Sequence, residues 1–167
     1  EEYNKKIKEY TTDPRFLPAS VLNLADDPTV PSPRKYFGQI IGTPGVMHRT
    51  SEIYAYYQEL AKASPLVKIE QLGISEEGRA INLVIIANEE SIKRLDHYKG
   101  QLTKLADPRK VTSTEADKII GDSKPIFYLN GGLHSTEMGS PEMLMELAYR
   151  LVTSQSDEIK NIRDNVI

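Results

Sequence analysis

Apolar residues recur with a helical period in several parts of the chain. Ile53, Tyr56 and Leu60 are spaced by three and four residues, which predicts the apolar face of a helix that starts near residue 50. This helix should end at the Ser-Pro pair of residues 64–65, because a residue that precedes proline is disfavoured in helical conformation. The same periodicity predicts further helices over residues 89–107, 112–121, 140–152 and 157–164.

The helix over residues 140–152 has the clearest start signal. Ser140 is suited to cap it, Pro141 to occupy its first position and Glu142 to place a negative charge in its first turn. Its expected core stripe consists of Met143, Leu144, Leu147, Ala148, Leu151 and Val152.

Other apolar runs predict strands. Residues 67–72 and 80–87 flank a polar connection that contains Gly78, a pattern typical of a β-hairpin. The second run reads Ala-Ile-Asn-Leu-Val-Ile-Ile-Ala, and such a continuous apolar run favours a strand buried on both faces. Residues 125–130 predict another buried strand, and residues 166–167 begin a further one.

The alternation of helices and strands predicts an α/β fold with a mixed, largely parallel sheet flanked by helices. Residues 1–46 differ from the rest, because prolines punctuate them and no regular period is visible between those prolines. We therefore divide the chain into a proline-rich N-terminal extension, residues 1–46, and a domain, residues 47–167. The extension is expected to wrap around the domain as an arm with few regular elements, with a flexible linker as the alternative.

Composition excludes several classes of function. The net charge of −3 gives no basic surface for nucleic acid, and no apolar run reaches the ~20 residues that a membrane-spanning helix needs. There is no cysteine, so a metal could be held only by His, Asp and Glu. His97 lies among charged residues of a predicted helix and is expected on the surface.

The strongest chemical signal lies in residues 130–137, which read Asn-Gly-Gly-Leu-His-Ser-Thr-Glu between a predicted strand and a predicted helix. Ligands of α/β sheets bind at the carboxyl ends of the strands, so this turn is well placed for chemistry. His134 and Glu137 are three residues apart and offer the nitrogen and oxygen donors that zinc accepts. Taken alone, the pair is also compatible with a histidine at a strand end and a glutamate at a helix start.

Three ordered motifs extend this signal over residues 47–167. Residues 48–54 read His-Arg-Thr-Ser-Glu-Ile-Tyr, residues 73–79 read Gly-Ile-Ser-Glu-Glu-Gly-Arg, and residues 132–137 contain G-x-H-x-x-E. In their order, spacing and predicted elements they resemble the opening of the zinc carboxypeptidases, the larger bacterial members above all. The resemblance implies the phosphorylase/hydrolase-like zinc peptidase fold, with residues 47–167 as the N-terminal part of its catalytic domain and the sheet cut short after Ile167.

The same resemblance implies the composition of the site. His134 and Glu137 would be ligands of a single zinc ion, with a third ligand, a histidine, downstream of Ile167. The residues that grip the substrate carboxylate and act as general base would also lie downstream, so no catalytic residue is expected within these 167 residues. Thr136 stands where some members carry an arginine that holds substrate, which leaves the substrate-binding residues undefined. His48 and Arg79 are given structural roles.

The expected function is therefore that of a fragment of a metallocarboxypeptidase that removes C-terminal residues from peptides. The fragment alone is expected to be inactive, to bind zinc weakly and to self-associate through uncovered apolar strands. Family resemblance also suggests a periplasmic or secreted protein. Two alternatives remain at this stage: a zinc-dependent amidase or deacylase of the same fold, and a non-catalytic interaction domain.

Overall fold

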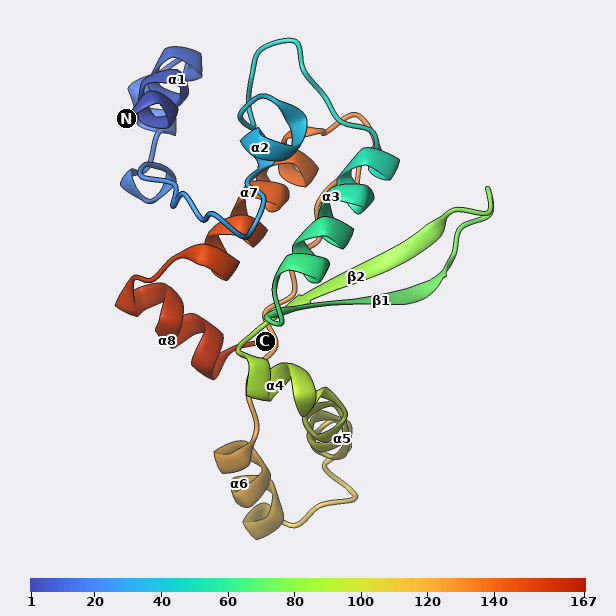
Figure 1. The fold of residues 1–167 in the computed structure, drawn as a ribbon. Coiled ribbons are helices and arrows are strands. Elements are labelled where there is room, and N and C mark those ends of the chain that lie inside the picture. Colours follow the sequence, from blue (N-terminus) through green and yellow to red (C-terminus); the bar gives the residue numbers. More distant parts are fainter.

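A computed structural model describes residues 1–167 and contains helices and one short two-stranded sheet (Figure 1). In chain order the elements are α1 (Glu2–Tyr10), the 3-10 turns η1 (Pro14–Phe16) and η2 (Ala19–Val21), α2 (Pro33–Phe37), α3 (Thr50–Ala63), β1 (Val67–Ile74), β2 (Ala80–Ile86), α4 (Glu89–Lys93), α5 (Leu95–Leu105), α6 (Ser113–Asp122), α7 (Gly139–Thr153) and α8 (Asp157–Asn165). None of the helices has both the length and the apolarity that a membrane crossing requires.

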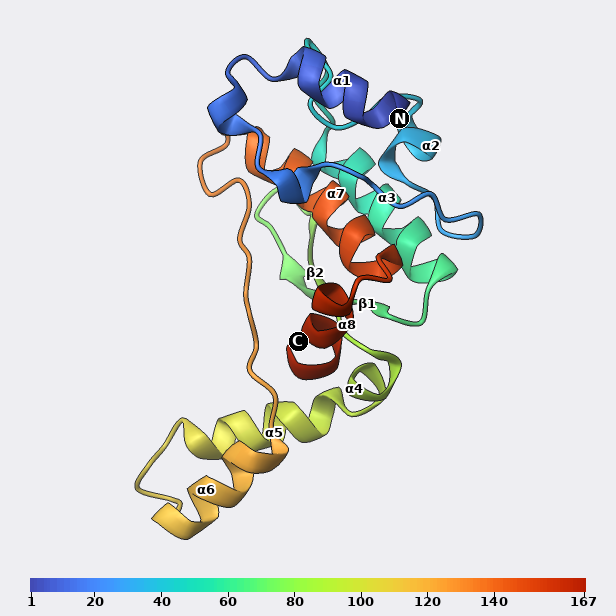
Figure 2. The ribbon, with the colours of Figure 1, turned by 90° about the vertical axis from the view of Figure 1, so that its left-hand side faces the viewer.

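The main core lies between α3 and α7, which run side by side (Figures 1 and 2). Tyr56 and Leu60 of α3 and Met145 and Tyr149 of α7 are fully buried. The base of the β-hairpin closes this core through Val67. The helix predicted from residue 50 is therefore confirmed, and its apolar face is the one that the spacing indicated.

The hairpin prediction is confirmed, but the surrounding sheet is not. β1 and β2 pair antiparallel from Val67↔Ile86 to Ile74↔Ala80, and they form the whole of a two-stranded sheet. The expectation that residues 80–87 are buried on both faces was wrong, because within β2 only Ile85 is buried. The hairpin extends away from the helices, so no second layer covers its outer half (Figure 1).

The expected largely parallel sheet is not formed, because residues 125–130 have almost no partner. They are extended but make no ladder, and four successive side chains are exposed: Ile126, Phe127, Tyr128 and Leu129. Two bonds join them to the end of the chain, from the Phe127 amide to the Ile167 carbonyl at 2.8 Å and from the Ile167 amide to the Pro125 carbonyl at 3.0 Å. This is the bonding pattern of a parallel pair, limited to one residue on the second strand.

The N-terminal segment, residues 1–46, lies along α7 and α3 (Figure 2). The Tyr3 hydroxyl donates to Glu146 of α7 at 2.5 Å. The pKa of Tyr3 is raised, mainly because the hydroxyl is buried and also because of this hydrogen bond. Arg150 of α7 donates to the carbonyl of Val21. A wrapped arm with few regular elements was expected, and the segment is more regular than that, because α1 forms before the first proline and α2 begins at a Ser-Pro start signal.

Helices α4, α5 and α6 lie at the opposite end of the molecule from α1 and α2, and α8 follows α7 between the two ends (Figure 1). The predicted helix over residues 89–107 is divided at Arg94, whose φ of −104° and ψ of 16° depart from helical values, into α4 and α5. α5 and α6 are joined by His97 Nε2 and Asp122 Oδ2, 2.7 Å apart. His97 is exposed, as its charged sequence context predicts.

Candidate metal centre

The turn that carries His134 and Glu137 connects the extended residues 125–130 to α7. Gly132 has a φ of 79°, in the left-handed region, which reverses the chain direction as the extended segment ends. The Glu137 amide then donates to the His134 carbonyl at 2.9 Å, closing a tight turn. The two candidate ligands are therefore the first and last residues of one β-turn, directly before a helix.

The first turn of α7 packs against the two glycines that open this turn. A Cβ atom on Gly131 would lie 2.7 Å from Leu144 Cδ1 and 3.2 Å from the Pro141 nitrogen. A Cβ atom on Gly132 would lie 2.9 Å from Pro141 Cγ, and the Gly132 amide donates to Ser140 Oγ at 3.1 Å. A side chain on either glycine would press on Leu144 or Pro141, and Gly132 also has a positive φ, so the Gly-Gly pair suits the close approach of the candidate turn to α7.

The donors in the turn suit zinc, but they are only two. The side chains of His134 and Glu137 are exposed and can accept a metal from solvent. No group of three or more His, Cys, Asp or Glu residues is placed to hold a metal, so this chain supplies at most a partial site.

Comparison with known proteins assigns the family. A family model described as zinc carboxypeptidase matches residues 53–167, more than two thirds of the chain. The chain belongs to the zinc carboxypeptidase family. Searches of curated proteins and of solved structures each found no match.

Membership in the zinc carboxypeptidase family makes this chain part of a hydrolytic, zinc-dependent class of peptidases. The matched region includes the hairpin turn with Arg79 and the turn with His134 and Glu137. It begins at Ile53, so His48 and the other residues just before α3 lie outside it. Arg79 is exposed at the hairpin tip and pairs with Glu77 at 2.8 Å, which agrees with a local structural role.

The other two histidines of this zinc carboxypeptidase chain are already engaged. His97 pairs with Asp122, as described above. His48 is buried, and its Nδ1 lies 2.9 Å from Glu142 Oε2 in the first turn of α7. Sequence analysis placed His48 at the start of α3 but missed this partner, because the two residues are 94 positions apart and nothing in their spacing connects them.

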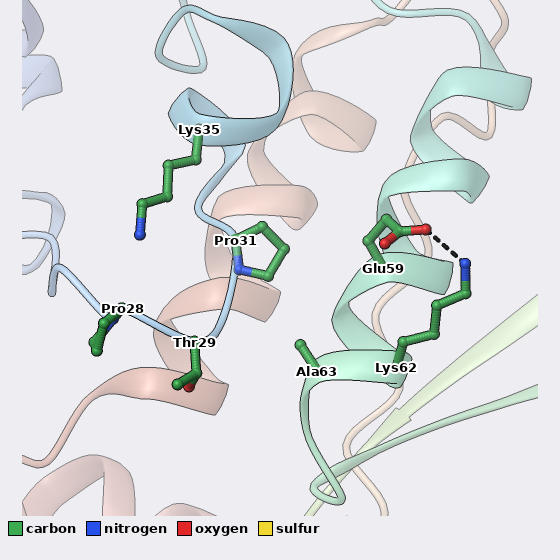
Figure 3. Close-up of a pocket in the computed structure, with 7 residues that line it drawn as sticks. All are labelled: Pro28, Thr29, Pro31, Lys35, Glu59, Lys62 and Ala63. Carbon is green, nitrogen blue, oxygen red and sulfur yellow. Dashed lines mark hydrogen bonds and ion pairs between the residues drawn. The ribbon is translucent and has the colours of Figure 1, made fainter.

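A surface hollow of about 470 Å³ lies elsewhere, between the N-terminal segment and α3 (Figure 3). Pro31 and Lys35 line one side, and Glu59 and Lys62 line the other. Both lysines already have partners, since Lys35 donates to the Asp27 carbonyl at 2.9 Å and Lys62 pairs with Glu59 at 2.7 Å. The hollow includes neither His134 nor Glu137, so it does not extend the candidate centre.

Proposed function

We propose that this chain is part of the catalytic domain of a zinc metallocarboxypeptidase, which removes C-terminal residues from peptides. The observation that carries the proposal is the position of His134 and Glu137 at the two ends of one exposed turn, inside the region that matches the family. The imidazole and the carboxylate would be two ligands of one zinc ion. Because no third ligand clusters with them, it would come from outside these residues.

A bound zinc ion would supply Lewis-acid chemistry, polarising the scissile carbonyl and acidifying a bound water. The role of this chain is to hold and orient that ion. Gly131 and Gly132 place the turn against α7, and the exposed side chains of His134 and Glu137 leave the remaining coordination positions open. The general base and the group that binds the substrate carboxylate would be supplied from outside these residues, so the isolated chain should not hydrolyse peptides.

Export to the periplasm or the cell exterior is part of the same proposal. It is supported by the resemblance to larger bacterial members of the family, and detection of the protein in periplasmic or culture fractions would test it.

Zinc titration of the 167-residue chain by calorimetry tests the metal site. We expect weak binding that His134→Ala and Glu137→Gln each reduce by more than the roughly 10–100-fold that loss of an outer-sphere partner costs. His97→Ala is the matched control, because His97 is also exposed and lies beside a carboxylate, yet belongs to no predicted site. Zinc binding that persists in His134→Ala and disappears in His97→Ala would refute the assignment.

A further inference from the structure

One buried carboxylate links the starts of the two core helices. Glu142, in the first turn of α7, accepts a hydrogen bond from the His48 backbone amide at 2.6 Å, and its Oε2 lies 2.9 Å from His48 Nδ1. Glu142 is 8% exposed and His48 is 5% exposed. The ring of Phe37 covers the imidazole, with ring centroids 3.9 Å apart. The residue that follows His48, Arg49, occupies the N-cap position of α3, and its amide donates to Glu52 at 2.7 Å.

A buried hydrogen-bonded pair of this kind is weak evidence for stability alone. Removing a carboxylate from water is costly, and apolar residues of similar volume often stabilise a core equally well. Such a pair does fix one geometry, because both partners must stay within bonding distance. The relevant question is what that geometry holds in place.

The metal-binding turn is held by the same helical turn that Glu142 anchors. The hydroxyl of Ser140 accepts a hydrogen bond from the Gly132 amide, and the ring of Pro141 lies next to Gly132. At its other end, Glu137 lies two residues before α7 begins at Gly139. Both ends of the turn therefore meet the first turn of α7, and a shift of that helical turn would move both.

We propose that Glu142, held by His48, is a positioning residue for the metal-binding turn. It locks the start of α7 against the start of α3, and this keeps residues 132–137 in one conformation. The consequence for zinc rests on the proposed function, but the positioning itself can be measured without metal.

The next buried glutamate of α7 provides a matched control. Glu146 lies one helical turn later, is equally buried at 8% exposure, and bonds to Tyr3 and Arg150. Its partners belong to the N-terminal segment and to α7 itself, and none belongs to the metal-binding turn. Glu146→Gln therefore removes a buried charge from the same helix without touching the link to α3.

Hydrogen exchange of the metal-free chain, read residue by residue by NMR, tests the proposal. Glu142→Gln should accelerate exchange of the Gly132 and Glu137 amides by about tenfold or more, since one of the two oxygens that bond to His48 is replaced by an NH2 group. Glu146→Gln should change these two exchange rates by less than about twofold. The exchange rate of the Leu60 amide, in the core of α3, should change by the same factor in both variants. Zinc affinity should fall about tenfold in Glu142→Gln alone.

A second pair of variants covers the case in which Glu142→Gln does not fold. His48→Gln keeps a side-chain N–H donor and should leave exchange at Gly132 close to wild type, whereas His48→Phe removes the donor and should accelerate it. Equal rates in these two variants, or equal acceleration by Glu142→Gln and Glu146→Gln, would overturn the proposal. The exchange rates at Gly132 and Glu137 could change as expected while His134→Ala binds zinc as tightly as the wild type. In that case Glu142 still positions the turn, and the proposed metal function fails.

Discussion

Gly132 and Gly45 have nearly the same backbone but different surroundings. Their φ values are 79° and 76°, both in the left-handed region that costs other residues about 1–2 kcal/mol. A Cβ atom on Gly132 would come within 2.9 Å of Pro141, whereas one on Gly45 would meet no atom within 4 Å. The two sites therefore separate the cost of backbone conformation from the cost of contact with α7.

Gly132→Ala should lower the free energy of unfolding by about 2–3 kcal/mol, and Gly45→Ala by about 1 kcal/mol. Both substitutions strain the backbone, but only the first also pushes Pro141 away from the turn. Urea denaturation followed by circular dichroism measures both values. Equal losses would mean that the contact between Gly132 and Pro141 contributes nothing to stability.

At this scale the sequence predicted the candidate site but not its support. The Gly-Gly pair, His134 and Glu137 were recognised as a turn before a helix, because all of the relevant residues are close in sequence. The packing of Gly131 on Leu144 and the bond between His48 and Glu142 were not predicted. Both depend on how α7 lies in three dimensions, and a periodic pattern along one helix does not contain that information.

Among the elements, α7 shows how a helix can be predicted while its buried face is not. The helix was predicted, but its start signal was wrong: Ser140 was expected as the N-cap and Pro141 as the first residue, whereas α7 begins at Gly139 after Met138. Met143 of the expected stripe is 47% exposed, and Met145 is fully buried. The stripe was chosen by apolar residues alone. The structure buries Glu142, Glu146 and Tyr149 on this helix as well, because His48 and the N-terminal segment supply polar partners for them.

Met145→Ala should destabilise the protein by about 2–5 kcal/mol, because it leaves a cavity between α3 and α7. Met143→Ala, two residues earlier on the same helix, should cost less than about 0.5 kcal/mol, because its side chain is largely in solvent. Thermal unfolding of the two variants compares them under one condition. A larger loss in Met143→Ala would reverse the orientation of α7 described here.

The strands also differ in how far the sequence predicts their structure. β1 and β2 were predicted because a hairpin needs only two neighbouring runs and the turn between them, and Gly78 supplies a φ of 77° in that turn. A parallel pair needs partners that are distant in the chain. Residues 125–130 have the composition of a buried strand, but composition cannot provide the partner, and only Ile167 pairs with them.

At the scale of the whole molecule, packing is concentrated on one side. The N-terminal segment, α3 and α7 share the main core, while the outer half of the hairpin and residues 125–130 leave apolar side chains in solvent. The N-terminal segment was expected to be irregular because of its prolines. One of them, Pro33, is compatible with helix α2, because it occupies the first turn of this helix, which Ser32 caps.

Exposed apolar groups in an extended segment favour association between copies of the chain. Ile126, Phe127, Tyr128 and Leu129 are consecutive and exposed, and their backbone is largely free to pair with another strand. Phe16, on the N-terminal segment, is exposed to the same degree as Phe127, at 70% against 72%, but it lies in a 3-10 turn with no such neighbours. The two phenylalanines therefore differ in context and not in exposure.

We expect the wild-type chain to associate at concentrations of about tens of micromolar. Phe127→Glu should reduce this association, because a charge on an exposed strand opposes edge-to-edge pairing. Phe16→Glu should leave the association unchanged. Sedimentation velocity over a concentration series measures both, and the free energy of unfolding should change by less than about 0.5 kcal/mol in each variant, since neither side chain is buried. If both variants sediment like the wild type, association does not involve residues 125–130, and the extended segment must be shielded in some other way.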